Sequence, residues 1–214
     1  MNFKRYSDKN INKIGILDIE TQGQGFDAQK GFMISWVLKI YNIKTRKSVT
    51  WYDIIDKNTF KRINRLMDQD KNKKIRKVRP YDKELLKSLI PKMQECDLIV
   101  THYGTWFDIP FIRTRAKMQN IPFIKHSDKI RFSDTWKIAR TLYKFPNNKL
   151  DTVARVLGVK GAKTLFDLYY WDATTRGNLK ALRYTLKHNF IDVDITFRIW
   201  KKIEESAPVS ARYY

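Results

Sequence analysis

Apolar and polar positions in the first quarter of the chain alternate, or form short runs rich in β-branched and aromatic residues. Both patterns are typical of β-strands. We expect strands over residues 13–20, 32–41 and 47–54. The connections between them, residues 21–31 and 42–46, are short. Short connections join antiparallel neighbours, so the three strands are predicted to form an antiparallel meander.

From residue 82 onward we expect helices separated by short strands, and in the last long helix the apolar positions recur at steps of three and four, the period of an amphipathic helix. The helices expected there cover residues 82–94, 109–119, 133–143, 150–157 and 179–204. Two short buried strands are expected between them, over residues 97–101 and 130–132. Three consecutive strands, followed by strands that alternate with helices, indicate one mixed α/β sheet covered by helices.

The length of 214 residues suits a single domain. We expect this domain to cover residues 13–205, with a polar segment at 1–12, a tail at 206–214 and an insertion at about 57–80. Hydrophobic residues make up 43%, enough to build a core, which excludes global disorder. The single cysteine, Cys96, excludes a disulfide framework and a cysteine-based zinc site, and it is expected to pack.

Membrane insertion and secretion find no support in the sequence. No apolar run approaches the roughly 20 residues that cross a bilayer, and the N-terminus has no apolar signal core. No amphipathic segment with a clean apolar face accompanies the basic residues. We therefore expect a soluble, intracellular protein, cytoplasmic or nucleoid-associated.

Charge points to a polyanionic partner. Lys and Arg number 43 against 22 Asp and Glu, a formal net charge of +21, which favours nucleic acid through phosphate contacts. Residues 57–79 hold ten basic side chains and two acids, and form either a solvated loop or part of a binding surface. Further basic residues are expected to extend a surface that follows a strand: Arg113, Arg115, Lys117, Arg176, Lys180, Arg183 and Lys187.

Two acids stand within the apolar run of residues 14–20. Asp18 and Glu20 are two apart, so on a strand both carboxylates point from the same face. Two like charges beside a core are costly unless a cation compensates them. Mg²⁺ and Mn²⁺ prefer carboxylate oxygens and would do so. The simpler alternative is a strand end where both acids reach water.

Two more acids invite the same question. Asp108 stands where a strand passes through a loop into a helix, a place that the helix dipole also explains. Asp192 lies inside the last helix, with His188 one turn before it on the same face. A carboxylate beside an imidazole can bind a metal or orient water, although an exposed helix acid would look the same. Asp194 has a structural explanation, because Arg198 follows it by four residues and is expected to pair with it.

The loop before Asp108 carries aromatic residues that could stack on bases. Tyr103 and Trp106 are the candidates, whereas Phe107 is expected to pack in the core and His102 to have a structural role. Other chemistries find little support: the sequence has neither a phosphate-binding Gly-rich loop followed by Lys-Ser or Lys-Thr nor a Gly-x-Ser-x-Gly turn.

Taken in order, these residues resemble the DEDD (DnaQ-like) superfamily of 3′–5′ exonucleases. The family's Asp-x-Glu motif is matched by Asp18-Ile19-Glu20, its second motif by residues 103–108 and its third by residues 188–192. Residues 133–140 and 149–158 look similar to stand-alone relatives of the proofreading exonuclease domain of family-B DNA polymerases. The resemblance runs from about residue 13 to residue 203. It implies an RNase H-like α/β fold: a mixed sheet of three antiparallel strands followed by parallel strands, flanked by helices.

The resemblance also implies a metal-dependent 3′–5′ exonuclease that acts on nucleic acid, single-stranded DNA being favoured. Asp18, Glu20, Asp108 and Asp192 would hold two divalent ions, Mg²⁺ or Mn²⁺, with Asp18 bridging both. His188 would orient or deprotonate the attacking water. Substrate contacts are expected from Thr21, Tyr103 and Trp106.

Two positions depart from the family pattern. Tyr103 stands where the family has Asn, and His188 precedes Asp192 by four residues, the spacing of the branch that uses tyrosine. Which residue orients the water therefore stays open. The alternatives are an RNA-processing exonuclease, an endonuclease on the same fold, and a nucleic-acid-binding module without catalysis. A protein partner is also left open.

Overall fold

The strands predicted from alternation form one mixed sheet with the order β3-β2-β1-β4-β5. The computed structural model describes residues 11–22, 28, 31–60, 81–125, 130–161 and 168–204. The strands are β1 (Lys13–Gln22), β2 (Phe32–Asn42), β3 (Ser48–Ile54), β4 (Leu98–Thr101) and β5 (Arg131–Asp134). The first three pair antiparallel, and β4 pairs parallel to both β1 and β5. This arrangement confirms the predicted meander and the mixed α/β class.

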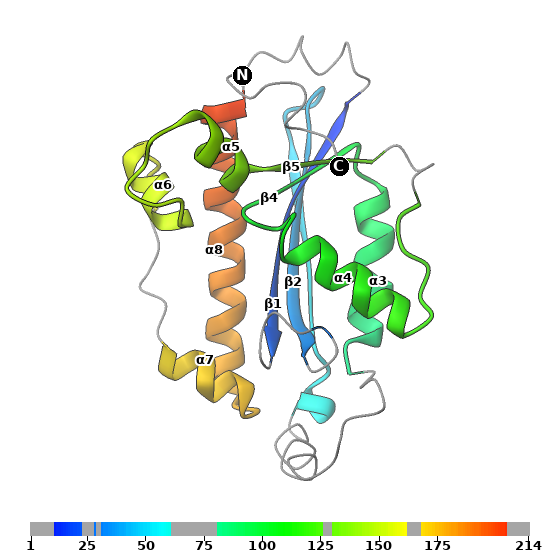
Figure 1. The fold of residues 1–214 in the computed structure, drawn as a ribbon. Helices are drawn as coiled ribbons and strands as arrows, with labels where there is room; N and C mark the ends of the chain where they lie inside the picture. The colour runs from blue at the N-terminus through cyan, green and yellow to red at the C-terminus, as the bar shows by residue number, and fades with distance from the viewer. Residues whose placement is uncertain are drawn as a thin grey trace.

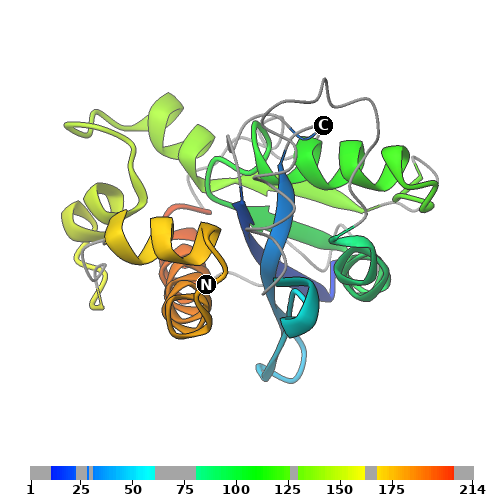
Figure 2. The same cartoon turned by 90° about the horizontal axis from the view of Figure 1, so that it is seen from below.

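Helices cover both faces of the sheet. They are α3 (Lys83–Gln94), α4 (Asp108–Met118), α5 (Thr135–Leu142), α6 (Leu150–Val156), α7 (Leu168–Thr175) and α8 (Leu179–Ile203). Figure 1 shows α3 and α4 on one side of the strands and α8 on the other, and the view from below in Figure 2 agrees. The predicted helix over residues 133–143 starts too early, because Ser133 and Asp134 pair with β4 as part of β5. Helix α7 was not predicted.

The two faces of β1 meet different helices. Leu17 and Ile19 belong to the core under α3 and α4, and Ile14 and Ile16 to the core under α8. Because Asp18 and Glu20 share the parity of Ile14 and Ile16, their side chains leave the strand on the α8 face.

Contacts between β2 and α8 follow the two elements in step. They join Ser35 to Asn189, Lys39 to Asp194 and Tyr41 to Phe197. The expected pair between Asp194 and Arg198 is therefore wrong. Lys39 Nζ lies 2.6 Å from Asp194 Oδ1, while Arg198 donates to the carbonyl of Lys160 at 2.8 Å. A cation supplied by the neighbouring strand takes the place of the one on the same helix.

One basic residue expected on the surface is buried instead. Arg115 on α4 is fully buried and forms a two-pronged ion pair with Asp82, which precedes α3, with N–O distances of 2.7 and 3.0 Å. Asp82 also accepts from the backbone N–H of Met33 at the start of β2. Arg115 thus ties two helices to the sheet and cannot belong to a surface that follows a strand.

Several predicted segments lie outside the described residues. Of the basic insertion, residues 57–60 form a helical turn in which Phe60 is buried, and residues 61–80 are not described. Most of the N-terminal segment and the whole C-terminal tail are likewise outside, so the predicted domain limits stay a prediction. In the part of the chain that is described, no helix has both the length and the apolar character needed to cross a membrane.

Candidate active site

The four acids singled out from the sequence meet at Asp18. Its pKa is raised well above the usual value by burial first, and then by the charges of Asp108, Asp192 and Glu20. The opposing influence is a hydrogen bond donated by the Asn189 side chain. Four carboxylates from β1, α4 and α8 therefore share one electrostatic environment, which we call the carboxylate cluster.

Asp108 is fixed by the point at which β1 and β4 separate. The two strands pair from Ile14 to Ile16, so the backbone N–H of Ile19 lies beyond the paired stretch. Asp108 Oδ1 accepts that N–H at 3.1 Å, although the side chain is buried. Burial raises the pKa of Asp108 to about 7, and the nearby charge of Asp134 adds to the rise. From the first turn of α4, Asp108 thus accepts a backbone N–H of β1 and also interacts favourably with the helix dipole.

Asp134 shapes the loop that leads into Asp108. It caps α5 by accepting from the N–H of Trp136, and it accepts from the N–H of Tyr103 at 2.9 Å and of Thr105 at 3.0 Å. Tyr103 is held with φ of 67°, a left-handed conformation that is strained for an aromatic residue. Asp134 was not among the predicted site residues. The sequence analysis placed it inside the helix predicted over residues 133–143, so it was identified neither as a cap nor as a loop anchor.

Asn189 is a second residue that the sequence analysis passed over. Its side chain is fully buried, accepts from Ser35 Oγ at 3.2 Å and donates to Asp18. Ser35 lies on β2 opposite Glu20 on β1. The amide therefore connects the carboxylate cluster to the meander and orients Asp18.

His188 lies in the same turn of α8 as Asp192 but is 1% exposed. Its ring packs against that of Tyr184, with centroids 4.5 Å apart, and Tyr184 in turn stacks on Tyr170 of α7 at 4.3 Å. The ring is thus held in a defined position by an aromatic stack. No feature of its sequence neighbourhood predicted this stack, because α7 itself was not predicted.

The predicted substrate residues fall into two environments. Tyr103 and Trp106 are 40% and 64% exposed, whereas Thr21 is buried just after a bulge in β1. Phe107 packs on the core beside Phe111, as expected.

An aromatic cavity of about 590 Å³ opens beside the loop. The Tyr103 ring meets the Trp136 ring edge-on at 5.0 Å, and the Arg140 guanidinium lies 5.1 Å from the Trp136 centroid. His102, at the wall of this cavity, contacts the Thr135 hydroxyl at 2.8 Å and the Asn148 carbonyl at 3.0 Å, which agrees with a structural role.

The donor set of the carboxylate cluster suits a hard divalent cation, since Mg²⁺ and Mn²⁺ prefer carboxylate oxygens. The raised pKa of Asp18 supports this fit, because its causes include no compensating cationic side chain. As the side chains stand, however, no three His, Cys, Asp or Glu residues in the described ranges are placed to hold a metal ion together. The chemistry fits, and the ligand arrangement is not complete in this conformation.

Comparison with known proteins places this geometry in a family. A family model described as the RNase_H superfamily matches residues 16–204. Among solved structures, the chain is similar to the family B DNA polymerase from the hyperthermophilic archaeon Pyrobaculum calidifontis, with 17% sequence identity and a TM-score of 0.62. The match covers 90% of this chain and 24% of that polymerase. No curated protein matches the sequence.

Proposed function

The chain belongs to the RNase H superfamily, and from that premise we propose that it is a metal-dependent nuclease that removes nucleotides from the 3′ end of single-stranded nucleic acid. The observation that carries the proposal is the meeting of four carboxylates, from three separate elements, at Asp18. Such a cluster costs stability, and a fold has no use for it unless a bound cation offsets the repulsion.

The four acids act together in the proposal. Asp18, which the charges of the other three acids influence, would hold the divalent ions together with Glu20, Asp108 and Asp192. Divalent ions held there would activate water and stabilise the charge that develops on the phosphate during cleavage. Asn189 and the Ile19 N–H orient Asp18 and Asp108 before substrate arrives.

We assign the handling of the water proton to His188. His188 lies one turn before Asp192 on α8, and packing against the Tyr184 ring restricts rotation of its imidazole. A fixed imidazole can accept a proton from water in the step in which the water attacks phosphorus, and it then carries that proton as an imidazolium.

The strand itself would be held by flat side chains. Tyr103 and Trp106 are exposed beside Asp108, and Tyr103 forms one wall of the aromatic cavity with Trp136 and Arg140. Aromatic rings and a guanidinium plane can each stack on a base, and such stacking tolerates any sequence. These groups support a substrate with unpaired bases.

The test is cleavage of 5′-labelled single-stranded DNA and RNA of one sequence, with Mg²⁺, Mn²⁺ or EDTA. We expect a ladder that shortens from the 3′ end with either metal and is absent in EDTA. Asp18→Asn should abolish the ladder and leave oligonucleotide binding intact, because the substitution removes a metal ligand and no basic group. Cleavage by that variant at the wild-type rate would refute the assignment, and the preferred sugar decides between DNA and RNA.

A nucleic-acid-binding module without catalysis is the second candidate. It is favoured by the incomplete ligand arrangement among the described residues. Tight, salt-sensitive binding of the same oligonucleotides, with no products under either metal, would select it. A 3′-blocked strand that is still cut would instead indicate internal cleavage.

A further inference from the structure

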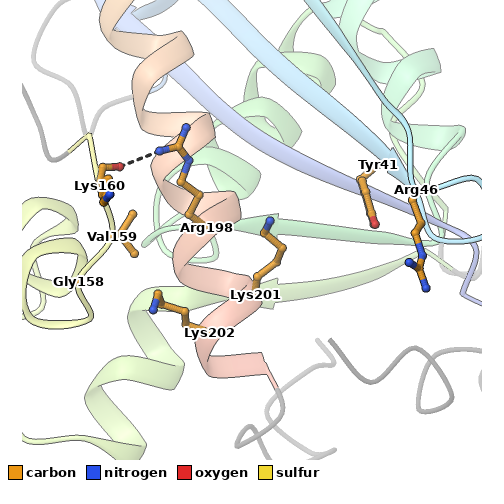
Figure 3. Close-up of a pocket in the computed structure, with 8 residues that line it drawn as sticks. All are labelled: Tyr41, Arg46, Gly158, Val159, Lys160, Arg198, Lys201 and Lys202. Carbon is orange, nitrogen blue, oxygen red and sulfur yellow. Dashed lines mark hydrogen bonds between the residues drawn. The ribbon is translucent and has the colours of Figure 1, made fainter.

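A second cavity, of about 710 Å³, lies at the C-terminal end of α8 and has a composition unlike that of the carboxylate cluster. Five of its eight lining residues are Lys or Arg and none is acidic. The five are Arg46, Lys160, Arg198, Lys201 and Lys202. Figure 3 shows them on three segments that surround the cavity: the turn after β2, the loop after α6 and the last turns of α8. We call this the basic cavity.

Arg198 lines this cavity because its expected partner is engaged elsewhere. Asp194 pairs with Lys39 of β2, so the guanidinium of Arg198 turns to the Lys160 carbonyl. One N–H contact leaves the rest of its donor fork for another acceptor. Lys201 is braced in a similar way, with its ammonium 4.6 Å from the centroid of the Phe197 ring. Both cations are oriented by groups that leave their charge uncompensated.

The helix dipole explains only part of this concentration. Cations in the last turn of a helix are stabilised by its negative end, which accounts for Lys201 and Lys202. It does not account for Lys160 or Arg46, which belong to other segments. Arg46 has φ of 57°, a backbone conformation that Gly or Asn adopts at lower cost. A cation therefore occupies a position that local structure would give to a smaller residue.

The basic cavity and the carboxylate cluster lie on different sides of α8. Lys201 follows Asp192 by nine residues, or two and a half turns at 3.6 residues per turn, so their side chains leave opposite sides of the helix. The rise between them is about 13 Å. Including the path around a helix that is about 10 Å wide, a strand must span roughly 20 Å or more to reach from one site to the other.

We propose that the basic cavity is a second binding site for the phosphate groups of a nucleic-acid strand, engaged by a part of the strand remote from the end at the carboxylate cluster. This inference rests on the proposed function, because it takes the substrate strand as the ligand. Guanidinium and ammonium groups are the donors that phosphate oxygens prefer. The volume lies within the range of small-molecule sites, which leaves room for a backbone segment as well as its phosphate.

The experiment measures binding in EDTA, where no cleavage occurs, by fluorescence anisotropy of 5′-labelled strands of about 3 and about 20 nucleotides at several salt concentrations. The variant combines Arg198→Gln, Lys201→Gln and Lys202→Gln, all at exposed positions of a helix that Gln tolerates. For the long strand we expect affinity to fall about tenfold or more, and the slope of log K against log salt to lose about 2. The short strand should bind as it does to wild type, because it cannot reach both sites.

The matched control removes the same charge from exposed positions outside the cavity: Lys83→Gln, Lys87→Gln and Lys125→Gln. It should weaken the long strand much less. Arg46→Asn serves as a second variant, since Asn suits the left-handed turn, and it should lower the slope by about 0.7 with no loss of stability.

Equal weakening by the cavity triple and the control triple would overturn the proposal, because general charge would then explain it. So would an unchanged long strand, or equal weakening of the short one. Because binding is measured without metal, the two proposals can fail separately. If the wild-type protein cleaves nothing but the cavity variant still loses affinity for the long strand, the nuclease function is refuted and the second binding site stands. If the protein cleaves normally from the 3′ end and the cavity variant binds the long strand like wild type, the second binding site is refuted and the nuclease function stands.

Discussion

Individual residues in the carboxylate cluster are placed at a cost to the fold. Asp108 is buried, and the hydrogen bonds from the backbone N–H groups of Ile19 and of Asp108 itself offset only part of the penalty for an ionised carboxylate. Its pKa of about 7 means that the folded chain keeps a proton that the unfolded chain releases near pH 4. Between these two pH values the folded state binds more protons, so its stability falls as pH rises.

Replacing Asp108 by Asn should remove that loss. The amide oxygen can still accept the Ile19 N–H, while the side chain no longer ionises. In EDTA, we expect Asp108→Asn to gain stability over wild type progressively from about pH 4 to about pH 7, and then to level off. The shift in pKa sets an upper limit of about 4 kcal/mol. Urea denaturation at about pH 5 and about pH 8 measures the difference.

The pH series supplies its own control. A variant that was merely better packed would gain the same free energy at both pH values. A constant difference, or a loss at the higher pH, would contradict the view that an ionised Asp108 is what destabilises the fold.

Whole elements were largely predictable, because periodicity depends on neighbours in the sequence. The strand and helix starts fall within a few residues of the prediction, and the parity that puts Asp18 and Glu20 on one face follows from alternation alone. Helix α7 was missed because its sequence, Leu-Tyr-Tyr-Trp-Asp-Ala-Thr-Thr, shows no helical stripe. The predicted start of α5 was wrong because the first two residues of the predicted helix, Ser133 and Asp134, pair with β4 as part of β5.

Pairings between elements could not be predicted in the same way. Arg115 looks like a surface cation until Asp82 is known to lie opposite it, 33 residues away in the sequence. Asn189 and Asp18 are separated by 171 residues, so the sequence around either residue does not predict the contact. The rule that joins residues four apart on a helix gave Asp194 the wrong partner for the same reason, since Lys39 comes from β2.

The packing of β1 against the start of β4 can be tested at Gly15. A Cβ there would lie 2.7 Å from Cys96 Sγ and 2.9 Å from Leu38 Cδ1, too close without movement. We expect Gly15→Ala to destabilise the protein by about 1–3 kcal/mol, the usual cost of overpacking. Denaturant unfolding of the single variant measures this.

The double variant identifies the cause. Cys96→Ala removes the sulfur that the new methyl group would meet, so Gly15→Ala should cost less in its presence than alone. Strictly additive free energies would show that Leu38 or backbone strain, and not the thiol, resists the larger residue.

On the scale of the whole molecule, two electrostatic regimes coexist. The net charge of +21 attracts polyanions and repels cations from most of the surface. The carboxylate cluster is a local exception, since the pKa of Asp18 is raised by burial and by three neighbouring acids. A nucleic-acid strand would therefore be drawn to the molecule at large, and a divalent cation to the cluster.

This contrast gives a test of metal binding that does not depend on activity. Mg²⁺ or Mn²⁺ at about 100 times its Kd should stabilise the fold by about 2.7 kcal/mol, which raises Tm by roughly 5–10 °C for a chain of this size. Thermal unfolding is followed with increasing metal, and with NaCl at matched ionic strength as the control. Asp18→Asn should lose most of the shift, because it removes the carboxylate at the centre of the cluster and the repulsion that the ion relieves. A chain this basic attracts few divalent ions non-specifically. An equal rise in Tm for the variant and the wild type would therefore mean that the ion binds elsewhere, and would exclude the cluster as the metal site.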